Sequence, residues 1–286
     1  MDESIQDILQ SPTDGTPLSK GLISGGGIKY QRTPSGILLL VENTKRPMDI
    51  VYDHDMFVRW QSILKERLRY YTGEKTLAGR MADITYKSIH YLNKRPKDGY
   101  ILDIGCGDGS QLKYLADRSN YIGIDRDLER LEILKKRYPE VTAIYCDATK
   151  LPFKSGSIKY IFSTNAFEHF WYLKEVILEC YRCTYESGEM VIVFPTEGGL
   201  WNLGRRLFSK RHFRRKYPSI DFELISHIEH CNNATQIVRT LQTFFDTRIR
   251  YLPTGIPTVF LNAFLEVKCR HYRSKERRFH LSTDNL

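Results

Sequence analysis

The sequence of 286 residues has no apolar run that approaches the length of a membrane-spanning helix. Such a helix needs about 20 predominantly apolar residues. The amino-terminal stretch MDESIQDILQSPTDG is acidic and polar, which is the wrong chemistry for a secretory signal. We therefore expect a cytoplasmic protein without a transmembrane segment, in which any membrane contact is peripheral and on the inner face.

Cysteines are few and do not form the pairs that bind metal. The six cysteines are scattered, and the only close pair is Cys180 and Cys183, inside a helical pattern. No second pair completes a zinc site. The segment from His227 to His230 lacks the helical i, i+4 histidine pair of a zinc protease. The sequence therefore predicts no metal site.

Positive charge exceeds negative charge, which gives a net charge of +9. Much of the excess lies in residues 204–217 and 268–280. Such a balance indicates acidic partners and does not determine the fold.

Residues 200–217 mix Trp201 and several leucines with arginines and lysines. A basic amphipathic helix with a tryptophan predicts peripheral contact with an anionic membrane surface, or with an acidic, lipid-linked substrate. A solvated lid over a hydrophobic seam is the alternative. RNA phosphates would also fit the charge, but nucleic acid is less favoured because the sequence shows no aromatic stacking platform and no RNA-binding module.

Short apolar runs alternate with amphipathic stretches after residue 99. The runs cover residues 100–104, 121–124, 142–145, 158–162 and 190–194, and helical periodicity covers 110–117, 128–137 and 170–185. This alternation predicts a parallel sheet with helices on both faces. Two further strands, at 247–252 and 263–272, form a terminal antiparallel hairpin after a helical insertion at 198–245.

The predicted fold class is therefore α/β, with a Rossmann-like, doubly wound, mostly parallel sheet of seven strands. Residues 1–55 have a different texture, rich in Gly, Pro, Ser and Thr with one strand signal at 36–41, and predict a small β-rich domain. Residues 56–286 form the large domain, which begins with apolar residues at helical spacing up to Leu92.

The stretch ILDIGCGDGS places Asp103 at the end of the first strand, followed by glycines at 105, 107 and 109. Glycines allow sharp turns and let a ligand approach main-chain N–H groups. The predicted helix from about Asp108 points its positive end at the same place. A dinucleotide loop would have G-x-G-x-x-G/A, whereas here the third glycine comes one position early. Asp103 would repel a pyrophosphate and would suit an ammonium group, which S-adenosylmethionine (SAM) carries.

Carboxylates follow the next two strands as well. Asp125 lies about 20 residues beyond the glycine loop, where a carboxylate can accept from both ribose hydroxyls. Asp147 follows the third strand and can accept from an adenine amino group, and Ala148 and Leu151 are apolar enough to line the base.

Four motifs in this order and spacing, ILDIGCGDGS, YIGIDRD, CDATKLPF and IKYIFSTNAFEHF, resemble the class I SAM-dependent methyltransferases, in particular the small-molecule, type-11-like branch. The resemblance covers roughly residues 71–272. It implies SAM as the cofactor and a set of cofactor-binding residues: Asp103, Gly105 and Gly107 for the methionine end, Asp125 for the ribose, and Asp147 and Ala148 for the adenine. Asn165 follows the fourth strand at the mouth of the site, where it can contact the cofactor or the acceptor.

The front region resembles the small zinc-ribbon-like domain that accompanies many bacterial methyltransferases. Where that family has Cys-Pro-x-Cys, this chain has Ser11 and Asp14, and the second cysteine pair is absent. Zinc is not expected here, so the domain must be held by its apolar strand packing on the larger domain.

Two histidines are candidate catalytic residues. His169 follows the fourth strand beside Glu168, and an imidazole that titrates near neutral pH can act as a base. The alternative is that the pair caps and orients the next helix. His230 lies in the insertion where this family builds its acceptor pocket, and the alternative for it is a buried, hydrogen-bonded histidine.

The sequence thus predicts a SAM-dependent methyltransferase that acts on a small-molecule acceptor or on a cell-surface glycan or lipid-linked acceptor. The alternatives are a tRNA or rRNA methyltransferase, which the charge alone favours, and a non-catalytic SAM-binding pseudo-enzyme.

Overall fold

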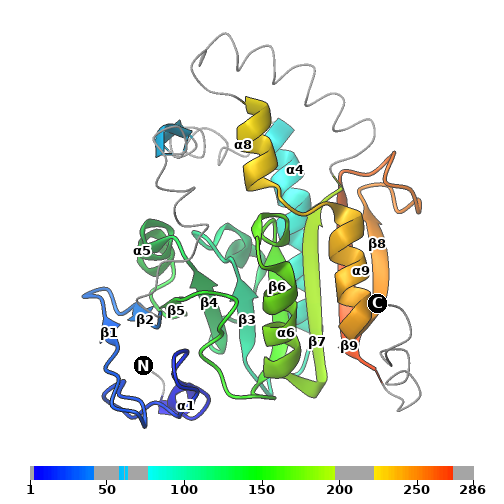
Figure 1. Ribbon diagram of the computed structural model, residues 1–286. Coiled ribbons are helices and arrows are strands. Elements are labelled where there is room, and N and C mark those ends of the chain that lie inside the picture. Colours follow the sequence, from blue (N-terminus) through cyan, green and yellow to red (C-terminus); the bar gives the residue numbers. More distant parts are fainter. Residues whose placement is uncertain (1–2, 42–57, 61, 64–76, 197–221, 273–286) are drawn as a thin grey trace, which may run out of the picture.

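The computed structural model describes residues 3–41, 58–60, 62–63, 77–196 and 222–272. One sheet of nine strands runs through the molecule in the order β1-β2-β5-β4-β3-β6-β7-β9-β8 (Figure 1). The strands are β1 (Gln31–Arg32), β2 (Leu38–Leu39), β3 (Ile101–Ile104), β4 (Tyr121–Asp125), β5 (Thr142–Tyr145), β6 (Ile158–Thr164), β7 (Thr184–Pro195), β8 (Phe245–Leu252) and β9 (Phe264–His271).

Strands β3 to β9 form the predicted seven-stranded α/β sheet. Strands β3 to β7 run parallel to one another, whereas β9 pairs antiparallel with both β7 and β8. The doubly wound fold with a terminal antiparallel hairpin is therefore confirmed. In such a sheet the carboxyl ends of β3, β4, β5 and β6 meet at one edge, which is where ligands bind.

Helices cover both faces of the sheet. Figure 1 shows α6 and α9 over one face and α4 behind the other. The helical elements are α1 (Glu3–Gln6), α4 (Leu77–Tyr86), η1 (Lys87–Lys94), η2 (Ser110–Tyr114), α5 (Leu128–Arg137), η3 (Phe167–His169), α6 (Leu173–Cys183), α8 (Phe222–Glu229) and α9 (Ala234–Phe244), where η denotes a 3₁₀ helix.

The two faces of the sheet have separate cores because strand side chains alternate between them. In β7, for example, Ile192 packs into the core under α6 and α9, whereas Val191 and Val193 pack into the core under η1, η2 and α5. Strands buried on both faces are typical of parallel sheets. This explains why the strands read as nearly continuous apolar runs in the sequence.

The predicted α-helix at 110–117 was wrong. The segment forms the short 3₁₀ helix η2, which starts after Gly109 in a left-handed conformation and ends at Tyr114. The buried Gln111 turns inward, where its Nε2 donates to Asp103 and to the carbonyl of Cys106. The side chain of Gln111 on η2 therefore stabilises the glycine loop. A five-residue 3₁₀ helix also has a smaller dipole than the predicted helix.

The N-terminal residues join the large sheet through β2, which pairs in parallel with β5. Their apolar side chains, including Ile5, Leu9 and Leu40, lie in the same core as β3 and α6. Strand β2 thus packs on the large sheet, and apolar side chains hold the N-terminal residues against it. The boundary near residue 55 lies outside the described residues.

Hydrogen bonds occupy the positions where a zinc ribbon has cysteines. Ser11 is buried, its hydroxyl contacts the Tyr30 hydroxyl at 2.8 Å, and it accepts from the N–H groups of Thr13 and Asp14. Asp14 accepts from the hydroxyl of Ser24 at 2.7 Å. The bond between Asp14 and Ser24 connects the turn that begins at Ser11 to the turn that begins at Ser24. The described residues contain no His, Cys, Asp and Glu cluster that could hold a metal ion.

Part of the predicted insertion at 198–245 is described, as α8 and α9, and both segments are helical as expected. The basic segment 200–217 lies outside the described residues, as does 273–280 of the second basic stretch. Among the helices that the structure describes, none is long and apolar enough to cross a membrane.

Candidate functional site

Asp103 lies fully buried at the end of β3, beneath the glycine loop. One oxygen, Oδ2, accepts from Gln111 Nε2 at 2.5 Å and from the Tyr121 hydroxyl at 2.6 Å. The other oxygen, Oδ1, has no hydrogen-bond partner among the described residues. Burial raises the pKa of Asp103 to about 7, against the two hydrogen bonds, which lower it. A buried carboxylate with one unpaired oxygen fits a cationic ligand group.

The glycine loop is closed by Asp125, at the end of the neighbouring strand β4. Its Oδ2 accepts from the N–H of Gly107 at 2.8 Å, and its Oδ1 accepts from the N–H of Asp127 at 2.9 Å. Burial raises the pKa of Asp125, while Arg130 and the two N–H groups act in the opposite direction. Each carboxylate oxygen retains a second lone pair, so Asp125 can also accept from ribose hydroxyls.

Gly105 and Gly107 both adopt positive φ, +71° and +53°. A Cβ at Gly105 would lie 2.5 Å from the Cβ of Ala166, and a Cβ at Gly107 would meet the guanidinium of Arg130. Both glycines therefore provide left-handed backbone and close approach at once. This is the property that the sequence predicted for the loop.

Arg130, on the first turn of α5, was not found by sequence reasoning. Its charge lies near those of Asp108 and Asp125, which raise the pKa of the guanidinium although burial lowers it. Arg130 thus balances carboxylates around the glycine loop. The sequence carried a weak signal, because position 130 follows the capping Asp127 by one helical turn and so faces the strand end.

Asp147 and Ala148 follow β5, beside Asp125. The Oδ1 of Asp147 accepts from the N–H and the hydroxyl of Thr149, and its Oδ2 lies 3.5 Å from the Arg126 guanidinium. Ala148 and Leu151 are buried. An acceptor and an apolar surface therefore adjoin each other, as an adenine pocket requires.

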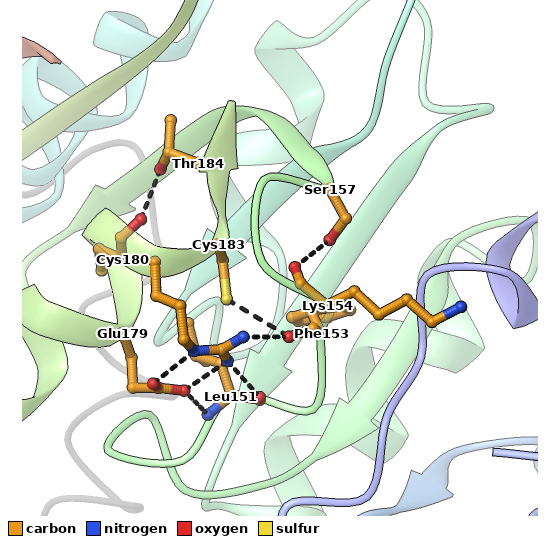
Figure 2. A network of polar contacts seen from close by, with 9 residues as sticks. Leu151, Phe153, Lys154, Ser157, Glu179, Cys180, Cys183 and Thr184 are labelled. Atoms are coloured by element: carbon orange, nitrogen blue, oxygen red, sulfur yellow. Dashed lines mark hydrogen bonds and ion pairs between the residues drawn. The ribbon is translucent and has the colours of Figure 1, made fainter. Parts of the chain in front are cut away.

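A polar network anchors the loop that carries these residues (Figure 2). Glu179 on α6 accepts from the N–H of Leu151 at 2.7 Å and pairs with both Nε and a terminal nitrogen of Arg182. Arg182 in turn donates to the carbonyls of Leu151 and Phe153. Bidentate pairs of this kind fix geometry as well as energy. The loop after β5 is therefore held to α6.

Asn165 ends β6 in a left-handed conformation, with φ +52°. Its Nδ2 donates to the hydroxyl of Thr85 on α4 at 3.0 Å, and its N–H donates to the carbonyl of Val193. Asparagine tolerates this backbone region better than most residues. The position lies beside Gly105 because the next residue, Ala166, contacts that glycine.

His169 and His230 lie together, although one comes from η3 and the other follows α8. Their ring centroids are 4.9 Å apart at an interplanar angle of 83°. The Nδ1 of His169 lies 2.6 Å from the carbonyl oxygen of Glu229. That oxygen can only accept, so Nδ1 carries a proton, and in the neutral ring Nε2 is the basic nitrogen. Glu168 is buried, with Oε1 3.7 Å from this Nε2.

Asn232 attaches the segment of His230 to η3 and was not found by sequence reasoning. It is buried, and its Nδ2 donates to the carbonyls of Phe167 at 3.1 Å and Phe170 at 2.6 Å. Its N–H donates to the carbonyl of Glu168. Trp60, also missed, is buried. Burial raises the pKa of Glu229, and the Trp60 side chain lowers it.

Comparison with protein families supports the pattern of strand-end residues. Residues 102–192 match a family model described as a methyltransferase domain. The chain contains a class I SAM-dependent methyltransferase domain. Its cofactor is SAM.

One relative of this chain, a probable SAM-dependent methyltransferase of Mycolicibacterium smegmatis, is 26% identical over 133 residues, or 43% of this chain and 51% of the relative. A mouse tRNA (carboxymethyluridine(34)-5-O)-methyltransferase is 33% identical over 84 residues, 29% of this chain and 12% of the relative. The chain thus spans about half the length of the first relative and much less of the second.

The fold of the methyltransferase also occurs among solved structures. A SAM-dependent methyltransferase of Thermotoga maritima, titled a possible histamine N-methyltransferase, superposes with a TM-score of 0.51 at 14% identity. The match covers 75% of this chain and 99% of that one. At this level of identity the similarity shows the fold alone.

The residues around the glycine loop of the methyltransferase fit its cofactor. The unpaired Oδ1 of Asp103 can accept from an ammonium group, and the backbone of Gly105 and Gly107 is free of Cβ atoms. Asp125 and Asp147 offer carboxylates at the next two strand ends. Three carboxylates at successive strand ends suit the ammonium, hydroxyl and amino groups of an amino-acid nucleoside.

Proposed function

We propose that this protein methylates a hydroxyl, or a similarly protonated nucleophile, of a small-molecule or glycan- or lipid-linked acceptor, with His169 as the general base. The observation that carries the proposal is the 2.6 Å contact between His169 Nδ1 and the Glu229 carbonyl. This contact leaves Nε2 of His169 as the basic nitrogen, on a side chain that is 41% exposed. An exposed base beside a cofactor loop can serve an acceptor that must lose a proton.

When bound, SAM supplies an electrophilic methyl group on a sulfonium. The protein's own residues would then orient the acceptor and take its proton at His169 Nε2. The buried Glu168 carboxylate, 3.7 Å from that nitrogen, would stabilise the imidazolium that results. His230 stands edge-on to the same ring and would limit its rotation.

The attachment of α8 to η3 supports an acceptor pocket at this position. Asn232 ties the segment after α8 to the carbonyls of Phe167 and Phe170, so the insertion contributes His230 directly to the strand-end site. The basic residues at 200–217 come from the same insertion and favour an anionic or lipid-linked acceptor.

Transfer of a labelled methyl group tests the proposal. Protein and methyl-labelled SAM are incubated with fractionated extract of the source cells, and the labelled fraction is identified. We expect label in a small-molecule or lipid-extractable fraction and none with the His169→Gln variant. SAM binding without label in any fraction would favour a non-catalytic SAM-binding protein instead.

A second candidate, methylation of RNA, is favoured by the net charge of +9 and by the tRNA methyltransferase among the relatives. Phosphate contacts release counterions, so RNA affinity would fall steeply with salt. Calorimetry with bulk RNA across a salt series separates the candidates. Label in the RNA fraction together with a steep salt slope would replace the first proposal.

A further inference from the structure

A groove lies at the opposite edge of the sheet from the β4 and β5 strand ends. Its volume is about 660 Å³, and it is lined by residues of α4, η1 and the β8–β9 hairpin. Cavities of roughly 300–1,000 Å³ are typical of small-molecule sites. The lining residues are Ile84, Lys87, Ser88, His90, Tyr91, Lys94, Arg95, Arg250, Leu252, Pro253 and Glu266.

The 3₁₀ geometry of η1 brings three of these residues into one row. A 3₁₀ helix has three residues per turn, so side chains at i and i+3 are eclipsed. Ser88, Tyr91 and Lys94 have this spacing, and all three line the groove. The row therefore presents two hydroxyls and an ammonium group along one wall.

Both hydroxyls in this row are buried and have no hydrogen-bond partner among the described residues. They are Ser88 Oγ and Tyr91 Oη. Native proteins pair nearly all such groups, and each exception needs an explanation. Two unpaired donors in one row on one cavity wall are explained by a ligand that accepts from both.

The charge around the groove is positive. Asp83 pairs with both Lys87 and Lys113. Because two cations share that carboxylate, one positive charge remains there. Lys94 is exposed and has no ion-pair partner among the described residues.

A second cluster of charges adjoins the groove at Arg95, which lines it. Glu189 is shared by Arg95 at 2.7 Å, by Lys268 at 2.9 Å and by Arg270. Glu266 is the one carboxylate that lines the groove itself in the described structure, and it lies 3.3 Å from Arg250. Among the described charged side chains that line the groove, the cations Lys87, Lys94, Arg95 and Arg250 therefore outnumber the single carboxylate, Glu266.

We infer that this groove binds a small phosphorylated molecule. Ionised phosphate oxygens accept hydrogen bonds. They are recognised by the groups present here, which are unpaired hydroxyl donors, an ammonium group and guanidinium groups. The site is distinct from the cofactor site, because α4, η1, β8 and β9 supply most of its lining residues and the ends of β3 to β5 supply none. The inference of a phosphate site does not depend on whether His169 acts as a base.

Titration calorimetry with inorganic pyrophosphate and with glycerol 3-phosphate tests the inference. We expect saturable 1:1 binding of at least one probe to the full chain, and at least tenfold weaker binding by Lys94→Gln. The matched control is Lys136→Gln, which removes an exposed lysine from α5, far from the groove in the strand order, and should bind like wild type.

A second variant separates a ligand role from a structural one. Tyr91→Phe removes a buried hydroxyl that has no partner in the described protein, so its Tm should not fall. Its affinity for the probe should nevertheless fall severalfold. No binding of either probe, or equal binding by all variants, would overturn the inference. So would binding only of a 20-nucleotide RNA or only of phosphatidic acid vesicles, since each identifies a different class of partner.

Discussion

The imidazole of His169 stands edge-on against that of His230, with ring centroids 4.9 Å apart. One ring follows the end of β6 and the other follows α8, in the insertion. The Glu229 carbonyl, one residue before His230, accepts from His169 Nδ1 and so selects the tautomer. The insertion therefore determines which nitrogen of the strand-end histidine is basic.

Replacing His169 by Gln should lower kcat by about 10²–10⁴, the usual contribution of a general base. The affinity for SAM should stay unchanged, since the carboxylates at the strand ends are untouched. Single-turnover methylation and calorimetry measure the two quantities. His227→Gln is the control, because His227 is exposed on α8 of the same insertion. Equal activity of the two variants would exclude His169 as the base.

Gly107→Ala should weaken SAM binding at least about tenfold, which corresponds to about 1.4 kcal/mol. The new Cβ would force the Arg130 guanidinium away from Gly107 and from the carboxylates that it balances. Gly156→Ala is the matched control, since Gly156 has a similar φ of +60° but nothing within 4 Å of a Cβ. It should cost only the backbone strain, about 1–2 kcal/mol of stability. If both variants bind SAM like wild type, close approach at Gly107 plays no part.

Asp103 should make the protein less stable as the pH rises from about 4 to 7. Its folded pKa is about 7, above the ordinary value of 3.8, so the folded state binds more protons than the unfolded state in this window. The stabilising contribution of Asp103 to the free energy of unfolding is fully present below about pH 4 and is lost as the pH rises past about 7. Urea unfolding of wild type and Asp103→Asn at several pH values measures it. We expect the variant to have the shallower loss, and a parallel pair of profiles would contradict the buried carboxylate.

Asn232→Ala should lower the free energy of unfolding by about 1–3 kcal/mol, because two carbonyls of the η3 segment lose their donor. It should also reduce methylation, since the bonds that hold His230 beside His169 are gone. Asn233→Ala is the matched control. Asn233 caps α9 by accepting from the N–H of Gln236 at 2.9 Å, so its loss costs about 1 kcal/mol without releasing the histidine pair. Equal activity of the two variants would show that the attachment does not position the site.

The positions of the strand-end carboxylates were predictable because they depend on local sequence. Asp103, Asp125 and Asp147 each follow an apolar run, and carboxyl ends of adjacent parallel strands meet at one edge. Glycine spacing likewise predicted a sharp turn open to close approach, and Gly105 and Gly107 both adopt positive φ. The helix at 110–117 failed because Gln111 bonds Asp103 across the loop, a tertiary contact that favours a 3₁₀ turn.

The sequence by itself determined the α/β sheet, the glycine loop and the carboxylates, since strand periodicity and backbone freedom are properties of short segments. Only the tertiary structure decided that β2 joins the sheet beside β5, that Arg130 lies against Gly107, and that His169 meets His230. These contacts depend on how whole elements pack, and no local pattern specifies which distant side chain fills a given space.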